Sequence, residues 1–320
     1  MDATADIDLQ VLQGSDHVEE VLDLLDAAER AAGIPMVDES ERERLERLAA
    51  GAIERSGNWV SILAREGGTP VGYAGFVDAG SPTEDDGTDP SAGERLASGD
   101  VAAPRAFGPG GPVLRRLLDH LVEVADARQL DGLLVWMRHA HADDLEVAQE
   151  HGFGIARRLA VLGRTLKEMD VPTIPGVTIR TYRPDLDDAG VVDVLAAAYA
   201  GTGDEGWDIA RFRERRELSW FRPEDLLVAV DGSGRILGLH WLKRRGAGVG
   251  EVYNLAIHPD AQGRRLGPLL LAAGLEHLRD IGCQEVLLWV DRANERAVDL
   301  YTSQGFTTRW DDVALRWPGE

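Results

Sequence analysis

The sequence predicts an α/β protein with two tandem domains, each a mixed central sheet flanked by helices. Its 320 residues, 44% of them hydrophobic, suffice for two ordinary cores. Residues 133–153 align with residues 286–306, and this alignment matches Trp136 with Trp289. An internal repeat of this kind indicates a duplicated domain. We therefore expect the same order of strands and helices to occur twice.

The repeat continues upstream in the order strand, helix, hairpin. Residues 7–16 and 177–187 each begin as a strand and lead into a helical stretch. Residues 60–76 and 226–242 each form a strand, a Gly-containing turn and a second strand, which is typical of a hairpin. Both halves therefore share one plan from their first strand onward.

The boundary between the halves is expected near residues 170–177. This segment contains two prolines and a glycine, which disfavour regular structure. We therefore assign residues 1–170 to an N-terminal domain and residues 171–320 to a C-terminal domain.

The most informative local pattern spans residues 250–278, where a strand with an acidic residue leads through a turn into an amphipathic helix. Val252, Leu255 and Ile257 are typical strand residues, and Pro259 ends the ladder because it has no N–H to donate. Apolar residues then recur at helical spacing. The segment is predicted to be a strand, a turn and a helix in succession.

The turn in this segment is suited to an anion. The first N–H groups of a helix lack intrahelical partners and carry the positive end of its dipole, and Arg264 and Arg265 add charge. Pro268 suits the first helical turn, where its missing N–H costs nothing. The patterns typical of ATPases and of dinucleotide folds are both absent from this turn. We therefore expect a phosphorylated ligand of another kind.

Composition and charge argue against several classes of protein. Fifty-six acidic against 34 basic residues give a net charge of -22, which disfavours binding to nucleic acid or anionic membranes. No apolar run approaches the roughly 20 residues that cross a bilayer, and the acidic start is unlike a secretory signal. The single cysteine, Cys283, fits a reducing compartment. We expect a cytoplasmic monomer.

The turn resembles the acyl-CoA pyrophosphate loop of the GCN5-related N-acetyltransferases, whose pattern is Gln/Arg-x-x-Gly-x-Gly/Ala. In this chain the loop is Gln262-Gly263-Arg264-Arg265-Leu266-Gly267. Arg265 stands where the family has Gly, a residue that allows a positive φ or a close backbone approach. If the loop bends as in the family, we expect Arg265 to keep an ordinary, negative φ with its side chain turned outward or onto a phosphate.

The tandem plan and the segments GLHWLK, GEVYNLAIHPDAQGRRLG and YTSQGF together resemble the mycothiol synthase family. The likeness is strong over about residues 172–317 and rests on layout alone in the first half. It implies two tandem GCN5-related N-acetyltransferase domains, with acetyl-CoA as co-substrate. It also implies a small-molecule acceptor, the cysteinyl amine of a cysteinyl-glucosaminyl-inositol. No metal is implied, and the irregular spacing of His139, His141 and His151 does not suggest one.

Two catalytic residues are carried over from the resemblance. An amine with a pKa of about 7.7 to 8.0 arrives mostly protonated, so a base must remove a proton, and Glu251 matches the family's base. Without the resemblance, Glu251 would be interpreted as a surface residue at a strand end. Tyr301 matches the acid that protonates the leaving thiolate, although a tyrosine on such a helix is more often core. The tetrahedral oxyanion would meet backbone N–H groups of the strand 255–257.

The cofactor contacts implied by the resemblance are the splayed strand, the pyrophosphate loop with its first helical residues, and the segment along the CoA arm. They are Leu255, Ala256, Ile257, Gln262, Gly263, Arg264, Arg265, Leu266, Gly267, Pro268, Asn294, Glu295, Arg296, Ala297, Val298 and Asp299. Within this set, Asn294 is expected to be the N-cap of the helix that carries the catalytic tyrosine.

Substrate contacts are implied at five positions besides the base. Lys243 could donate to sugar or inositol hydroxyls, with a solvated surface lysine as the alternative. An acidic contact falls on Asp204 or Glu205, because a one-residue gap leaves the alignment open. Glu41 would come from the first half, and a helix start with charged neighbours explains it equally well. Trp289 stands where the family usually has Tyr, and its indole N–H can still donate.

The first half departs from the family at its functional positions. At the place of the pyrophosphate loop it has residues 107–116, FGPGGPVLRR, and at the place of the catalytic tyrosine it has Ala148. We expect it to be a degenerate, non-catalytic domain, with bound CoA as the alternative. Two other functions remain open for the whole chain: an N-acetyltransferase for a different amine, and a non-catalytic acyl-CoA-binding protein.

Overall fold

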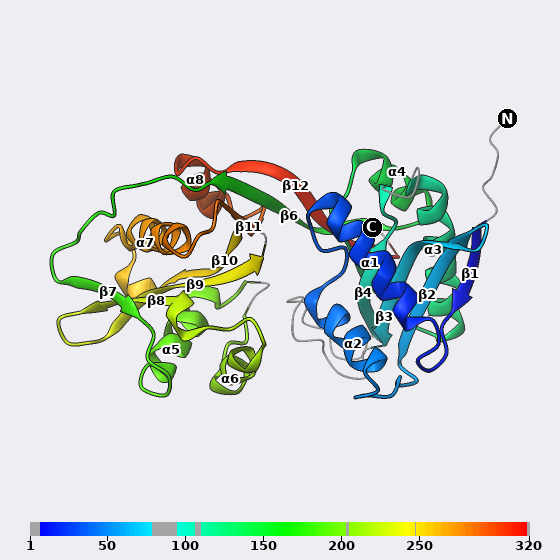
Figure 1. The fold of residues 1–320 in the computed structure, drawn as a ribbon, viewed down its shortest axis with the longest axis horizontal. Helices are drawn as coiled ribbons and strands as arrows, with labels where there is room; N and C mark the ends of the chain where they lie inside the picture. The colour runs from blue at the N-terminus through cyan, green and yellow to red at the C-terminus, as the bar shows by residue number, and fades with distance from the viewer. Residues whose placement is uncertain (1–6, 79–94, 106–109, 203–204, 247, 319–320) are drawn as a thin grey trace. The chain divides into compact units, whose positions relative to one another are not determined.

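The computed structural model describes residues 7–78, 95–105, 110–202, 205–246 and 248–318 (Figure 1). These residues form two compact units. Unit 1 contains those up to residue 159 and those from residue 310 onward, and unit 2 contains those from 160 to 309. Each unit is a mixed sheet with helices on both faces, so the predicted fold class is confirmed.

Unit 1 contains the first half of the repeat and the end of the chain. Its elements are β1 (Ile7–Val11), α1 (Val18–Ala32), α2 (Glu39–Ala49), β2 (Trp59–Glu66), β3 (Thr69–Asp78), β4 (Leu96–Ala102), α3 (Gly110–Ala127), β5 (Gly132–Met137), α4 (Ala142–Glu150) and parts of β6 (Gly154–Thr165) and β12 (Thr307–Trp317). The strands β1 to β4 pair antiparallel in sequence order, and β4 pairs parallel with β5.

The two faces of this sheet are buried by different helices. Alternation along each strand sends neighbouring side chains to opposite faces. Tyr73 packs in one apolar cluster with residues of α1 and α2, such as Leu25 and Leu45. Phe76 packs in a second cluster with residues of α3 and α4, such as Leu117. Unit 1 therefore has a three-layer arrangement of helices, sheet and helices.

Unit 2 repeats this plan. Its elements are β7 (Val177–Thr181), α5 (Asp188–Tyr199), α6 (Ile209–Glu217), a 3-10 turn (Pro223–Asp225), β8 (Leu226–Asp231), β9 (Ile236–Gly246), β10 (Val249–Ile257), a second 3-10 turn (Pro259–Ala261), α7 (Leu266–Asp280), β11 (Glu285–Asp291) and α8 (Glu295–Ser303). The strands follow the order β7-β8-β9-β10-β11-β6, with β10 and β11 parallel.

The sheet of unit 2 is also covered on both faces. An aromatic-rich cluster around Trp241 and Phe212 joins it to α5 and α6. On the other face, Val252 packs with Leu271 and Leu275 of α7 (Figure 1). The predicted first strand and hairpin are present in both units, as β1 with β2–β3 and as β7 with β8–β9. Among the helices that the structure describes, none is both long enough and apolar enough to span a bilayer.

The boundaries of the units differ from the predicted division at residue 170. Residues 160–170 belong to unit 2, and residues from 310 onward belong to unit 1. The cause is strand pairing, because Val313–Trp317 of β12 bond antiparallel to Leu133–Met137 of β5. Ladder hydrogen bonds thus place the last strand with the first half of the repeat.

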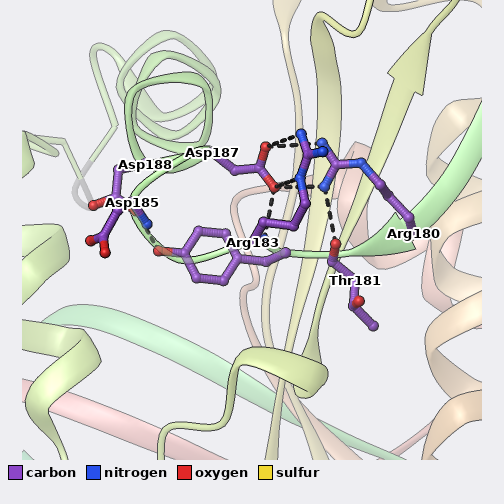
Figure 2. A network of polar contacts seen from close by, with 7 residues as sticks. Arg180, Thr181, Arg183, Asp185, Asp187 and Asp188 are labelled. Atoms are coloured by element: carbon purple, nitrogen blue, oxygen red, sulfur yellow. Dashed lines mark hydrogen bonds and ion pairs between the residues drawn. The ribbon is translucent and has the colours of Figure 1, made fainter.

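A buried carboxylate fixes the turn between β7 and α5. Asp187 accepts hydrogen bonds from Arg180 at 2.6 and 2.9 Å and from the main-chain N–H of Arg183 at 2.8 Å, as Figure 2 shows. Burial raises the pKa of Asp187, but the hydrogen bonds from both arginines outweigh it and hold that pKa well below its usual range. The ionised side chain of Asp187 therefore holds the turn between β7 and α5 in place.

Candidate active site

Glu251 lies on β10 and points away from α7. A Cβ placed on the preceding Gly250 would lie 2.7 Å from Leu278 of α7, and Val252 packs against the same helix. Because side chains alternate along a strand, Glu251 must project from the opposite face. Only 6% of its surface is exposed. The predicted base is thus a buried carboxylate and not a surface residue.

Two cations on β9 lie beside this carboxylate. Arg245 donates from Nε to Oε2 of Glu251 at 2.6 Å, and its guanidinium lies 4.6 Å from the ring centroid of Trp289. Lys243 is the cross-strand partner of Glu251, and its Nζ lies 4.6 Å from the ring centroid of Trp220. The structure therefore brings together three of the residues expected from the sequence and adds Arg245 and Trp220, which were not expected.

The strands β10 and β11 separate after Val252, the residue that follows Glu251. Their parallel pairing runs from Val249 opposite Glu285 to Val252 opposite Leu288 and ends there, although β10 continues to Ile257. Tyr253 is an extra residue in the ladder with β9, since Val252 pairs with Leu242 and the next pair is Asn254 with Trp241. Such a bulge bends its strand and interrupts pairing. The predicted segment Leu255–Ile257 thus has an edge without bonds to β11.

Tyr301 lies on α8, on the other face of the sheet. It is 8% exposed, its ring lies 5.6 Å from that of Phe306, and it shares an apolar cluster with Val252 and Leu288. Burial raises the pKa of its hydroxyl, so Tyr301 is protonated at neutral pH. Among the described residues, no hydrogen bond joins it to Glu251. The two predicted catalytic groups flank the last paired residues of β10 and β11 from opposite faces.

The pyrophosphate loop leads directly into α7. Gly263 has a φ of +78°, Leu266 begins the helix and is buried, and the loop residues from Gln262 to Arg265 are exposed. The Oε1 atom of Gln262 accepts a hydrogen bond from Arg296 of α8 at 3.0 Å. This contact joins two of the segments expected to bind the cofactor.

The expectation for Arg265 was wrong. Its φ is +59° and its ψ is +25°, in the left-handed region that favours glycine. Arg265 is the N-cap of α7, and the next residue is locked into the core, since Leu266 is 1% exposed. The path of the chain into the helix therefore imposes the conformation that Gly adopts in the family motif, and the arginine bears a cost of roughly 1 to 2 kcal/mol.

The start of α8 follows the sequence prediction. Asn294 is the N-cap, and its side-chain oxygen accepts from the main-chain N–H of Ala297 at 3.1 Å. The predicted N-cap is therefore confirmed. Glu295, Arg296 and Asp299 are exposed along the following turn. The segment from Asn294 to Asp299 thus begins at an ordered helix end next to the pyrophosphate loop.

The structure describes two of the three remaining predicted substrate contacts. Asp204 is outside the described residues. Glu205 is exposed and accepts from the main-chain N–H of Gly201 at 2.8 Å. Glu41 lies in unit 1, in the first turn of α2, where it is 2% exposed and accepts from Trp59 Nε1 at 3.1 Å and from the hydroxyl of Tyr73 at 2.5 Å. Glu41 thus stands at a helix start, and its carboxylate is buried in a hydrogen-bond network.

The histidines singled out in the sequence show no metal-like geometry. The rings of His139 and His141 stack at 4.8 Å between centroids, and Nδ1 of His151 lies 2.8 Å from the carbonyl oxygen of Val147. In the part of the chain that the structure describes, no three His, Cys, Asp or Glu side chains are grouped as metal ligands would be.

Comparison with known proteins supports the interpretation drawn from the motifs. Residues 192–306 match the family model described as Acetyltransferase (GNAT) family. A mycothiol acetyltransferase of Stackebrandtia nassauensis is 37% identical over 300 residues, covering 92% of each chain. A mycothiol acetyltransferase of Geodermatophilus obscurus is also 37% identical, over 314 residues and again 92% of each chain.

Solved structures agree on the fold. A GCN5-related N-acetyltransferase from Sphaerobacter thermophilus has a TM-score of 0.66 and 19% identity, covering 100% of this chain and 98% of the other. A tandem GNAT protein from the clavulanic acid biosynthesis pathway also has a TM-score of 0.66, with 17% identity and 97% and 98% coverage. At such low identity these likenesses concern architecture alone. The two mycothiol acetyltransferases, in contrast, are 37% identical to this chain over 92% of its length. The chain belongs to the mycothiol acetyltransferase family.

Proposed function

We propose that this chain transfers the acetyl group of acetyl-CoA to the cysteinyl amine of 1-O-[2-(L-cysteinylamido)-2-deoxy-α-D-glucopyranosyl]-1D-myo-inositol, giving mycothiol and CoA. The observation that carries this proposal is the buried Glu251, placed where β10 and β11 stop pairing in a chain that matches its relatives along 92% of its length. The acceptor follows from the family to which the chain belongs.

The proton steps follow from the two flanking groups. Glu251 takes a proton from the acceptor ammonium, whose pKa is about 7.7 to 8.0 when unperturbed. The amine nitrogen then forms a bond to the thioester carbonyl carbon, and the carbon–sulfur bond breaks as the carbonyl re-forms. The nitrogen releases its second proton to solvent, from which Tyr301 regains the proton that it donates. Tyr301 donates its proton to the departing thiolate. Burial keeps Tyr301 protonated until that step.

Acetyl-CoA would be held by main-chain groups and by cations. The turn from Gln262 to Pro268 presents the unbonded N–H groups of the first turn of α7, together with the exposed Arg264 and Arg265. The free edge of Leu255–Ile257 offers N–H groups to the tetrahedral oxyanion. The start of α8, tied to the loop through Arg296, would lie along the CoA arm.

We further propose that the first half is non-catalytic. Alignment of the paired strands puts Ser98 at the position of Glu251, and Ala148 occupies the position of Tyr301. The parallel pairing in unit 1 extends one pair beyond its counterpart, to Asp100 opposite Trp136. Arg138 then lies 3.8 Å from Asp100, and 3.3 Å from Asp38 and from Asp312. Ion pairs therefore surround the end of this ladder.

The acidic composition and the single cysteine support a cytoplasmic location for the enzyme. We also propose a monomer that requires no metal for the transfer. Size-exclusion chromatography with light scattering would check the monomer, and activity after dialysis against a chelator would check the metal.

The function is tested by incubating the full chain with acetyl-CoA and the cysteinyl glycoside, and measuring the acetylated product by mass spectrometry. An acetylated glycoside formed in proportion to released CoA is the expected result. Acetylation of other amines but not of this one would replace the acceptor. Acetyl-CoA binding without turnover on any amine would reduce the chain to a binding protein.

A further inference from the structure

Arg245 occupies an irregular position in the ladder beside the base. Val249 pairs with Gly246 and the next residue, Gly250, pairs with Arg244, so Arg245 is an extra residue on β9. A bulge of this kind re-aims a side chain, and bulges are frequent next to active sites. The two neighbouring arginines diverge accordingly. Arg244 bonds to Asp225 at 2.7 and 2.8 Å, whereas Arg245 bonds to Glu251 at 2.6 Å.

Trp289 supports Arg245 from β11, on the other side of β10. The guanidinium lies 4.6 Å from the indole centroid, within the range of a cation–π contact, and its side chain is 23% exposed. The ammonium of Lys243 lies over a different indole, that of Trp220. Among the described residues, Arg245 is therefore the group that hydrogen-bonds the Glu251 carboxylate.

We propose that Arg245, supported by Trp289, is a positioning residue for acetyl transfer, an inference that rests on the proposed function. Its Nε fixes one oxygen of Glu251 and leaves the other, Oε1, to receive the proton from the acceptor ammonium.

Arg245 is one of several groups that face Glu251. From β9 the facing groups are Lys243 and Arg245, and from β11 they are Leu287, the parallel partner, and Trp289. On β10 the next residue on this face, Tyr253, is the bulge, and Tyr199 of α5 bonds to Asn254 at 2.8 Å. Lys243 is the second cation, and its ammonium lies 4.6 Å from the ring centroid of Trp220.

The test compares Arg245→Met with Arg245→Lys. With the acceptor varied, Arg245→Met should lower kcat/KM for the acceptor by roughly tenfold or more, because Glu251 loses the donor that fixes its Oε2. Arg245→Lys should restore part of this loss, and the KM for acetyl-CoA should stay within about twofold. Arg244→Met, which removes the same charge from the neighbouring residue, serves as the control and should leave kcat/KM unchanged.

A second measurement separates this inference from the proposed function. The carbon-13 NMR signal of the Glu251 carboxyl is recorded at pH 7, with Glu251→Gln used for assignment and circular dichroism used to verify folding. A displaced signal in Arg245→Met, returned toward its wild-type position in Arg245→Lys, is expected even without substrates, because the carboxylate loses and regains a hydrogen-bond donor. An unchanged signal would overturn the role of Arg245 whatever the activity. A displaced signal in a chain that acetylates no amine would overturn the proposed function alone.

Discussion

The two units differ in the sizes of the residues that lie between the hairpin and the long helix. Where one unit has a small strand residue and a large helix residue, the other has the reverse. The repeat alignment matches Ala74 with His240 on the second strand of the hairpin. The alignment of residues 133–153 with 286–306, continued upstream without a gap, matches Leu121 with Gly274 on the long helix. Unit 1 thus has a small strand residue and a large helix residue, both fully buried in one apolar cluster. Unit 2 has a large strand residue, and a Cβ on Gly274 would overlap the imidazole of His240.

The exchange changes the chemistry of the layer. Nδ1 of His240 lies 2.8 Å from the carbonyl oxygen of Leu270, within α7. Complete burial lowers the pKa of His240 from 6.5 to about 4, so unit 2 holds a neutral imidazole there. Interiors are close-packed, so a large side chain on the strand requires a small residue on the helix beside it. The residues at these two positions are therefore expected to depend on each other.

Loss of the base gives the largest expected contrast between the units. Glu251→Gln should lower kcat/KM for the acceptor by roughly 10² to 10⁴ below neutral pH, because the acceptor then stays protonated. The loss should shrink as the pH rises past about 8 and the free amine forms unaided. The matched substitution in unit 1, Ser98→Ala, should leave turnover unchanged. Initial rates from pH 6 to 9 measure both, and full activity in Glu251→Gln would remove that residue from the mechanism.

The packing exchange can be tested by converting unit 2 to the arrangement of unit 1. Gly274→Leu should destabilise the protein by about 3 kcal/mol, because the new side chain overlaps His240. The double variant with His240→Ala restores the pairing of unit 1 and should recover at least half of that loss. Denaturant unfolding at pH 7 supplies the measurement. If the two substitutions simply add, the contact is not the compensated pair described above.

The pH dependence of stability offers a further check on this pair. His240 has a folded pKa of about 4, below its ordinary 6.5, so the unfolded chain binds the proton more readily. Its contribution to stability is therefore complete above pH 6.5 and is lost as the pH falls from 6.5 toward 4. The double variant lacks this titration and should show a shallower decline over that window.

Tyr301 provides a smaller contrast, with Ala148 as its natural counterpart. Tyr301→Phe should lower kcat by about tenfold while the KM for acetyl-CoA changes little, since the ring is retained and only the proton donor is lost. The effect should be seen as a reduced rate of CoA release at saturating substrates. A large change in KM with an unchanged kcat would assign Tyr301 to binding and packing, the role that its apolar surroundings also permit.

Features that depend on residues close together in the chain could be predicted from the sequence, whereas features that depend on pairing between distant strands could not. The repeat predicted both sheets, and Asn294 was recognisable as an N-cap because capping depends on a side chain and a main-chain group three residues apart. Arg245 could not be recognised, since a bulge leaves no trace in the period of a strand and the ion pair depends on register between two strands. The pairing of the final strand could not be recognised for the same reason, because its partner β5 lies far away in the chain.

At Arg265 the backbone preference of the residue conflicts with the path of the chain, because an arginine disfavours the positive φ that the entry into α7 requires. Its substitution gives the smallest expected effect. Arg265→Gly should stabilise the protein by about 1 kcal/mol, because glycine adopts a φ of +59° without strain. It should also weaken acetyl-CoA binding several-fold, since a charge beside the pyrophosphate loop is lost. Arg265→Lys keeps both the strain and the charge and should change neither quantity by much. Urea unfolding and calorimetric titration with acetyl-CoA measure the two effects. If Arg265→Gly gained stability without losing affinity, the charge of Arg265 would not strengthen acetyl-CoA binding. Ligand binding would then not explain why an arginine occupies this strained position.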